Sequence, residues 1–229
     1  MSTTALIVGA GSGLSASLAR LFAKEGMTVG LVARQIEKLT QLSSEIGAVN
    51  FAADVSKPDE VKQLFIDVDN KLGSLNVVVY NPSFRVRGPL IDLDPSEVAK
   101  TLDITAYGGF LVAQAAAKRM LHQGSGAILF TGASAGVKGY PQSAPFAMGK
   151  FALRGLAQSI ARELAPKNIH VAHFVIDGAI RSAERQDSVD NPDSTLDPDA
   201  IAQTYLSILR QPRSAWTWEI ELRPWVEKF

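Results

Sequence analysis

The sequence predicts an α/β fold, in which a single Rossmann-type, doubly wound parallel sheet of about seven strands carries helices on both faces. Three observations support this prediction. Short apolar runs alternate with helical apolar patterns along the 229 residues. The first run, Ala5–Val8, leads through Gly9, Gly11 and Gly13 directly into a helical pattern. No internal repeat or linker divides the chain, so residues 1–229 are expected to form one dinucleotide-binding domain.

The apolar runs give the order of the elements. Strands are predicted where a run has the length of a buried strand, at Ala5–Val8, Thr28–Ala33, Val49–Ala52, Leu75–Tyr80, Ala127–Thr131, His170–Ile176 and Trp218–Leu222. Helices are predicted between them, near residues 14–25, 35–46, 58–72, 95–122, 145–165 and 198–209. Pro58 and Pro95 each suit the start of the helix that follows. Right-handed crossovers between such elements place the ligand-binding loops along one edge of the sheet.

Composition excludes several classes of protein. Lys and Arg together number 23, as do Asp and Glu, so charge gives no case for binding nucleic acid or an anionic membrane surface. The absence of Cys excludes disulfides and thiol catalysis. The N-terminal apolar run is short and follows no basic segment, so we expect a cytoplasmic protein without a signal peptide or membrane span. No cluster of His, Asp or Glu has the spacing of a metal site.

The glycine turn is a candidate phosphate site, because it joins a buried strand to a helix N-terminus. Leu14 stands at the last glycine position of the G-x-G-x-x-G pattern, so a plain strand-to-helix turn is the alternative. Arg34 closes the second strand, where dinucleotide folds usually place an acidic residue for the ribose 2′-hydroxyl. A cation suits a 2′-phosphate, so the sequence favours NADP over NAD. The expected phosphate-binding residues are Gly9, Gly11, Ser12, Gly13 and Leu14.

Further landmarks follow in order along the chain. The spacing Gly9-xxx-Gly13-x-Ser15 is followed by Asp54-Val55 after the third strand and by Asn81 after the fourth. Lys150 begins the segment KFALRGLAQSIARELAPKNIHV, and Asp177-Gly178-Ala179-Ile180 follows the sixth strand. With these residues, the chain resembles the short-chain dehydrogenase/reductase family over nearly its full length.

The resemblance implies a role for each landmark. The glycine turn would hold the cofactor pyrophosphate, and Asp54 and Val55 would contact the adenine. Asn81 would secure the backbone around the site, and Lys150 would bond the hydroxyls of the nicotinamide ribose. Ile180 completes the cofactor-binding set, in the turn after the sixth strand.

The catalytic residues that the resemblance implies are only partly present. The family builds its site from Asn, Ser, Tyr and Lys, and the matching positions here are Thr105, Ala133, Phe146 and Lys150. Phe146 can neither donate nor accept a proton, and loss of a general acid or base typically removes about 10²–10⁴ of rate. Ser134 and Tyr140 are the candidate replacements, beside water and the substrate itself. The alternatives are a turn Ser and an ordinary surface or packing Tyr, and His173 is expected to be a hydrogen-bonded core residue.

The sequence is compatible with two functions. The first is an NADP-dependent oxidoreductase that acts on a small carbonyl or hydroxyl compound through an altered active site. The second is a catalytically silent NADP(H)-binding sensor, scaffold or subunit. The resemblance also implies that copies of the chain associate through the helices at 95–122 and 145–165 as a homodimer or homotetramer. The polar segment 182–198 is either a lid or an exposed connection, and the Trp-rich C-terminus is either a buried strand or a subunit contact.

Overall fold

The computed structural model describes residues 3–187 and 189–227. Within these residues, the centre is a seven-stranded parallel sheet, which confirms the predicted fold class. The strand order is β3-β2-β1-β4-β5-β6-β7. The strands are β1 (Thr4–Val8), β2 (Thr28–Ala33), β3 (Val49–Ala52), β4 (Val77–Tyr80), β5 (Gly126–Thr131), β6 (Ile169–Ile176) and β7 (Glu219–Leu222).

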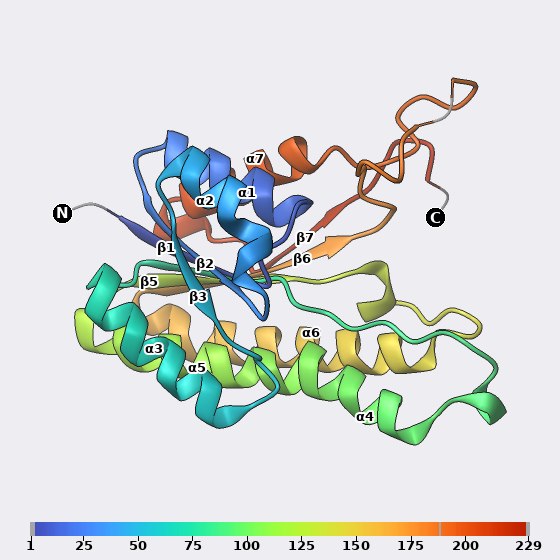
Figure 1. The fold of residues 1–229 in the computed structure, drawn as a ribbon, viewed down its shortest axis with the longest axis horizontal. Coiled ribbons are helices and arrows are strands. Elements are labelled where there is room, and N and C mark those ends of the chain that lie inside the picture. Colours follow the sequence, from blue (N-terminus) through green and yellow to red (C-terminus); the bar gives the residue numbers. More distant parts are fainter. Residues whose placement is uncertain (1–2, 188, 228–229) are drawn as a thin grey trace.

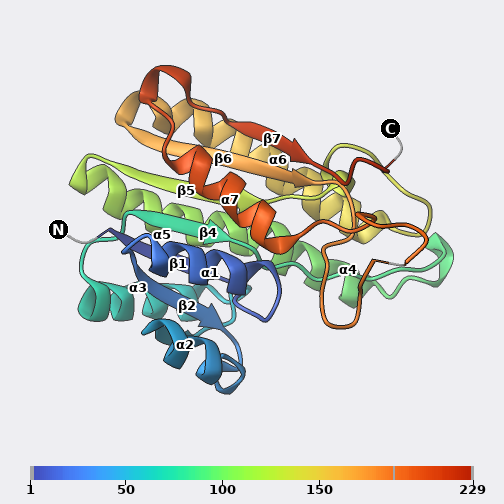
Figure 2. The same ribbon diagram turned by 90° about the horizontal axis from the view of Figure 1, so that it is seen from above.

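Two layers of helices enclose the sheet (Figure 1). One layer holds α1 (Leu14–Lys24), α2 (Thr40–Ile46) and α7 (Pro198–Leu209). The opposite layer holds α3 (Pro58–Leu72), α4 (Pro95–Leu102), α5 (Gly108–Gln123) and α6 (Ala144–Leu164). Figure 2 shows α1 and α7 side by side over the strands. Each layer packs on its own apolar cluster, because alternate residues of each strand face opposite sides of the sheet.

The strand order determines where a ligand can bind. β1 pairs with β2 on one side and with β4 on the other, so the order of the strands reverses at β1. Crossover connections on opposite faces leave a crevice at the carboxyl ends of such a strand pair. The turn after β1, the end of β2 and the loop after β4 therefore meet at one edge of the sheet.

Local sequence explains most helix starts. Pro58, Pro95 and Pro198 each occupy the first turn of a helix, where a missing N–H costs nothing. The Asp94 and Asp197 carboxylates cap α4 and α7, each accepting a backbone N–H at 2.8 Å. In contrast, α1 begins after a glycine and has no side-chain cap.

The helix predicted over 95–122 is interrupted, and this corrects the sequence interpretation. A single π-helical turn, Asp103–Tyr107, separates α4 from α5. The buried Tyr80 hydroxyl donates a hydrogen bond to the Ile104 carbonyl oxygen within this turn, at 2.5 Å. A Cβ on Gly108 would lie 2.6 Å from the same hydroxyl. Tyr80 thus occupies space beside the helix and takes up a backbone carbonyl, which is a usual cause of such an irregularity.

The remaining differences are small. The helix predicted near 35–46 starts with a 3₁₀ turn at Ile36–Leu39 before α2, an arrangement common at helix N-termini. The strand predicted from Trp218 begins at Glu219 and is half-buried at the sheet edge, where it pairs with β6.

The polar segment 182–198 is described except for residue 188. Its two ends lie together, since Ile180 forms a parallel bridge with Leu196. Whether it closes over a ligand stays a prediction. Among the described residues, no helix combines the length and apolar character needed to cross a membrane.

Candidate functional site

Two adjoining cavities lie at the carboxyl ends of the strands. The first has a volume of about 860 Å³ and lies beside the ends of β1, β2 and β4. The second, of about 750 Å³, lies beside the ends of β5 and β6 and the start of α6. Asn81 and Ser83 line both cavities, so the two form one continuous candidate site.

Every residue predicted to bind cofactor lines one of these cavities. Those of the first cavity are Gly9, Gly11, Ser12, Arg34, Asp54, Val55 and Asn81. Those of the second are Gly13, Leu14, Asn81, Lys150 and Ile180, and the second cavity also holds the predicted proton donors Ser134 and Tyr140. The fold brings these residues together from the loops after six strands and from two helices. Their roles toward a ligand remain predictions.

The glycine turn presents bare backbone to the site. Gly9 has a φ of +82°, and a Cβ there would lie 2.7 Å from the Pro82 nitrogen, so only glycine fits. A Cβ on Gly11 or Gly13 would meet no atom within 4 Å, which leaves open space for a ligand against the backbone. Because α1 has no side-chain cap, its first N–H groups are available to an anion. This arrangement fits a cofactor pyrophosphate.

Asn81 supports the glycine turn through a short chain of hydrogen bonds. Its side-chain nitrogen donates to the Ser15 hydroxyl at 2.7 Å, and that hydroxyl donates to the Gly9 carbonyl oxygen at 2.9 Å. The Asn81 backbone N–H also donates to the Val8 carbonyl oxygen at 3.0 Å. Asn81 therefore connects the loop after β4 to the turn after β1.

Charged residues gather where β2 and β3 end. Arg34 and Lys38 both line the first cavity, and neither has an ion pair with a carboxylate within residues 3–187 and 189–227. Asp54 lines the same cavity. Burial acts to raise the pKa of the Asp54 carboxyl, but hydrogen bonds from Ser56 and the charge of Arg34 outweigh it and lower that pKa. Two cations and one fixed carboxylate thus face the same space.

Lys150 is buried beside the second cavity. Its ammonium donates a hydrogen bond to the Thr131 carbonyl oxygen at 2.8 Å. Burial lowers the pKa of Lys150 to about 8. The Thr131 hydroxyl is itself bonded to the buried Tyr205 hydroxyl at 2.9 Å. Lys150 is therefore a buried residue that is held by the end of β5.

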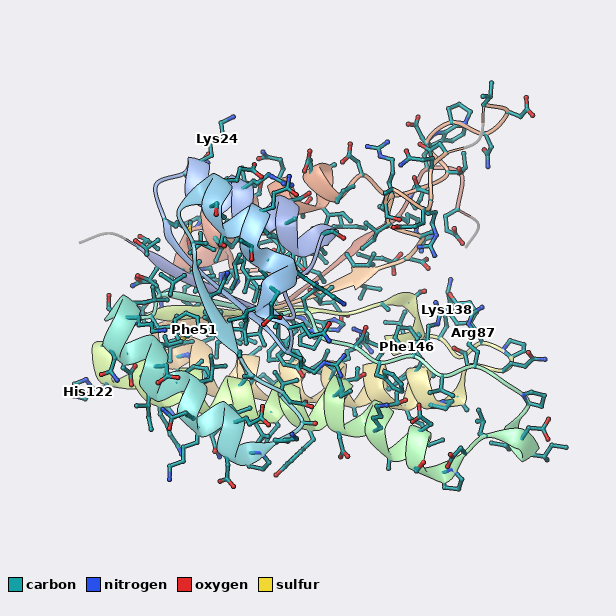
Figure 3. All side chains as sticks on the ribbon, in the orientation of Figure 1. Lys24, Phe51, Arg87, His122, Lys138 and Phe146 are labelled. Atoms are coloured by element: carbon teal, nitrogen blue, oxygen red, sulfur yellow. The ribbon has the colours of Figure 1, made fainter. Side chains whose placement is uncertain are left out.

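Phe146 lies one helical turn before Lys150 on α6 and lines the second cavity. Its ring centroid lies 5.8 Å from the Lys150 ammonium nitrogen and 4.9 Å from the guanidinium carbon of Arg85. Figure 3 shows Phe146 and Arg87 at the same end of the molecule, where β6 ends. Two cations therefore lie against one aromatic ring at the inner wall of the site.

Thr105 lies within the π-helical turn and is fully buried. Its hydroxyl accepts a hydrogen bond from the Phe84 backbone N–H at 3.3 Å. A Cβ on Gly149 would lie 3.0 Å from the Thr105 Cβ, so this turn packs closely on the start of α6. Thr105 thus supports the loop after β4 rather than lining the second cavity.

The two predicted proton donors differ in surroundings. Ser134 begins a 3₁₀ turn, and its carbonyl oxygen accepts the backbone N–H groups of Val137 and Lys138 at 2.9 Å each. Tyr140 is 41% exposed, and the Lys138 ammonium lies 5.7 Å from its ring centroid. Ser134 thus lies in a turn and also lines the second cavity, whereas Tyr140 lies at the solvent side of that cavity.

His173 is a core residue, as predicted. It is fully buried, and its Nδ1 lies 3.0 Å from a Glu219 carboxylate oxygen, which also pairs with Arg154. Burial lowers the pKa of His173 to about 4, against the opposing charge of Glu219. The ring lies behind Gly132, where a Cβ would approach Nε2 to 2.3 Å, so His173 is separated from the second cavity by backbone.

Sequence reasoning missed several basic residues that line the site. Lys38 lies four residues after Arg34, in the 3₁₀ turn Ile36–Leu39 that follows β2, and its closeness to Arg34 in the sequence was an available signal. Arg85 and Arg87 alternate with apolar residues after Asn81, but nothing local indicates that they face a cavity. Among the described residues, no group of three or more His, Cys, Asp or Glu could hold a metal ion.

A doubly wound parallel sheet with a glycine turn and a continuous site at its carboxyl edge defines a dinucleotide-binding α/β protein. The chain belongs to the short-chain dehydrogenase family, whose model matches residues 3–192.

Individual relatives cover nearly the whole chain. A short-chain dehydrogenase from Rhodopseudomonas palustris is 37% identical, with a TM-score of 0.84 over 97% of this chain and 99% of that one. A metagenomic short-chain oxidoreductase, solved in complex with NADP, is 26% identical, with a TM-score of 0.85 over 97% of each chain. Carbonyl reductase family member 4 of Xenopus laevis is 27% identical over 220 residues, which is 93% of each chain.

Proposed function

We propose that this protein is an NADP-dependent oxidoreductase that acts on a small carbonyl or hydroxyl compound. The observation that carries the cofactor preference is the pair Arg34 and Lys38, which face the first cavity without a carboxylate ion pair in the described part of the chain. Membership of the short-chain dehydrogenase family supports the reaction class. The NADP complex of the metagenomic relative supports the cofactor, and the name of the Xenopus laevis carbonyl reductase supports the reaction class.

The residues of the first cavity account for the binding of the adenosine half. The backbone N–H groups of the glycine turn would hold the pyrophosphate, and Asn81 keeps that turn in place through Ser15. Arg34 and Lys38 would hold the 2′-phosphate. Asp54 and Val55 would lie against the adenine, and Val55 is itself buried.

The second cavity would hold the nicotinamide half and the substrate. Lys150 would bond the ribose hydroxyls from its buried position on α6, and Ile180 would close the opposite wall. Bound NADPH supplies a hydride for the carbonyl carbon of a substrate. The chain must then place that carbonyl, exclude water and deliver a proton to its oxygen.

Proton delivery is the step for which this chain departs from its family. Phe146 stands at the position where the family carries Tyr, four residues before Lys150. A phenylalanine ring has no exchangeable proton, so another group must act. Lys150, with a pKa of about 8, titrates near neutral pH, where a general acid is most effective. Ser134, Tyr140, water and the substrate itself are the other candidates.

The same observation favours a second candidate function. With Phe146 in the site, the protein is expected to keep cofactor binding even if chemistry is lost. A catalytically silent NADP(H)-binding sensor, scaffold or subunit would then need the first cavity intact and the second only in part. The two functions therefore share the cofactor site and differ at Phe146.

One experiment separates the two candidates. A screen of carbonyl and alcohol substrates, followed by NADPH absorbance, is run beside a calorimetric titration of NADPH and NADH. Turnover of any compound above the rate without enzyme supports the oxidoreductase. Tight NADPH binding with no turnover across the screen supports the silent protein. Absence of binding to either nucleotide would contradict both.

We further propose that the protein forms a homodimer or homotetramer through α5 and α6. Large apolar side chains are exposed along these helices and the turn before α5, namely Tyr107, Phe110, Leu121, Met148 and Phe151. Light scattering after size exclusion should show two or four copies, and Phe110→Lys with Phe151→Lys should give a monomer. A cytoplasmic location stays a prediction from the sequence.

A further inference from the structure

The second cavity has an excess of positive charge. Four arginines line it, two from the loop after β4 (Arg85 and Arg87) and two from the segment after β6 (Arg181 and Arg185). These segments are about a hundred residues apart in sequence and meet only in the folded chain. An accumulation of this kind is unexpected for a protein with as many acidic as basic residues.

Within residues 3–187 and 189–227, only one of the four arginines forms an ion pair with a carboxylate. Arg181 pairs with the carboxylates of Asp197 and Asp187. Arg85, Arg87 and Arg185 have no ion pair with a carboxylate within residues 3–187 and 189–227.

The acidic residues of the cavity do not balance this charge. Asp177 is buried and already lies 3.0 Å from an Arg223 nitrogen and 3.4 Å from the Lys138 ammonium. Glu227 is the other carboxylate among the described residues that line this cavity. Among the described residues, three guanidinium groups therefore face one available carboxylate, and an anion of one or two charges would restore the balance.

The arginines act on one another, as groups that share a small space do. The pKa of Arg85 is lowered, chiefly by burial and further by the charges of Arg87 and Arg185. Like charges held close together are unfavourable unless an opposite charge enters between them. Their arrangement is therefore better explained by a ligand than by the stability of the fold.

Arg85 connects this charge to the place where chemistry would occur. Its guanidinium lies against the Phe146 ring, 4.9 Å from the centroid, and Phe146 in turn lies near Lys150. An oxyanion bound by Arg85 would thus be held beside the predicted nicotinamide position. A planar guanidinium binds carboxylate and phosphate through two parallel hydrogen bonds, which also fixes the orientation of the bound group.

We propose that the second cavity binds a small carbonyl compound that carries a carboxylate or a phosphate, through Arg85, Arg87 and Arg185. The inference rests on the proposed function for the statement that the bound molecule is the substrate. The anion site itself depends only on the placement of the three arginines. Neutral aldehydes and ketones should be poor ligands, because they leave the guanidinium charges unpaired.

The test uses two pairs of probes whose members differ in charge. Pyruvate is compared with methyl pyruvate, and dihydroxyacetone phosphate with dihydroxyacetone. Each is titrated calorimetrically into the full chain loaded with NADP⁺, and each is assayed for oxidation of NADPH. We expect the charged member of at least one pair to bind about tenfold or more tightly than its neutral partner, and the difference to shrink as salt is added. The pair that discriminates identifies carboxylate or phosphate as the preferred group.

Three variants assign the effect to the arginines. In the double variant Arg87→Gln with Arg185→Gln, the preference for the charged probe should fall to about twofold or less. Arg162→Gln is the matched control, because Arg162 is exposed on α6 and donates to the Gln158 carbonyl oxygen of its own helix. It should keep the full preference. Arg85→Lys keeps the charge but loses the paired geometry, so we expect an intermediate preference.

The outcomes are distinguishable from those of the proposed function. Equal binding of charged and neutral probes, or a preference that survives the double variant, would overturn the anion site even if carbonyl compounds are reduced. A loss of NADPH affinity in the double variant, with no change for the probes, would reassign the arginines to the cofactor and also overturn it. Arginine-dependent binding of anions without any NADPH oxidation would support the site and contradict the oxidoreductase.

Discussion

The Lys150 ammonium donates a hydrogen bond to the Thr131 carbonyl oxygen at 2.8 Å, in a place where the lysine is only 3% exposed. The bond joins the start of α6 to the end of β5. The carbonyl oxygen favours the charged ammonium, but on burial an ammonium loses far more hydration than a neutral amine does, and this loss outweighs the bond. This difference is why the pKa of Lys150 is lowered to about 8.

The first prediction is a pH-dependent stability that depends on Lys150. Its pKa is about 8 in the folded protein and about 10.4 in an unfolded chain, so between these values the unfolded state binds more protons. Stability should therefore rise with pH from 8 to 10.4, by up to about 3 kcal/mol. Lys150→Met lacks this contribution. Urea unfolding of both proteins from pH 7 to 10 should show that the unfolding free energy of the wild type increases relative to that of Lys150→Met as pH rises.

Comparison with Lys150→Met cancels the pH dependence that all other groups contribute to the unfolding free energy. A difference in unfolding free energy that stays constant from pH 7 to 10 would show that Lys150 titrates as an exposed lysine. Below pH 8 the lysine is protonated in both states, so the difference should be flat there.

The second prediction concerns two glycines of the same turn. Gly9→Ala forces a side chain to a φ of +82° and places its Cβ 2.7 Å from the Pro82 nitrogen, so both the fold and cofactor binding should suffer. We expect a loss of about 1–3 kcal/mol of stability. Gly11→Ala is the matched control, because its Cβ meets no atom within 4 Å.

For Gly11→Ala, the melting temperature should stay near that of the wild type, while NADPH binds at least about tenfold more weakly because a methyl group occupies ligand space. Thermal melts and calorimetry measure the two effects separately. If both variants bind NADPH normally, the turn is a plain strand-to-helix connection.

The fold was predictable because its signals are local. Pro58 and Pro95 mark helix starts that the structure reproduces to the residue, and the apolar run Thr28–Ala33 is a strand with the predicted bounds. The π-helical turn was not predictable, because its cause is Tyr80, which lies on a strand more than twenty residues earlier and reaches the helix only in the folded state.

The cofactor half of the site was more predictable than the substrate half for the same reason. Gly9 and Arg34 lie at the ends of strands that the sequence identifies, so the parallel fold alone brings them together. Arg185 lies on an irregular segment after β6, and its approach to Arg87 depends on tertiary packing that no periodicity reports. The order of charges in the sequence therefore gave no indication of the anion site.

The third prediction concerns cofactor choice. NADPH should bind roughly ten- to a hundredfold more tightly than NADH, because hydrogen bonds to a charged group are worth about 1.5–3 kcal/mol. Arg34→Ala should remove most of this preference. Lys38→Ala should remove a smaller part, because Lys38 offers a flexible point charge rather than a paired donor.

Calorimetry with both nucleotides on the three proteins measures this preference. NADH affinity is the internal control and should be unchanged in both variants, since NADH has no 2′-phosphate. Equal affinity of the wild type for NADPH and NADH would contradict the proposed role of the two cations.

The last prediction concerns Phe146 and the missing proton donor. Phe146→Tyr adds a hydroxyl to a ring that lies 5.8 Å from the Lys150 ammonium nitrogen, where a cation stabilises a phenolate. Carbonyl reductase activity should appear or increase, and Phe146→Tyr with Ala133→Ser should exceed it, because groups that act as a catalytic unit are strongly non-additive. Ala133→Ser alone is the control and should add little, since it supplies no acid. Steady-state assays with NADPH measure the activity of each variant, and thermal melts measure its stability.

If the new hydroxyl has no hydrogen-bond partner, Phe146→Tyr should lose about 1–3 kcal/mol of stability. An inactive, destabilised variant would place Phe146 in the packing of the fold rather than in the active site.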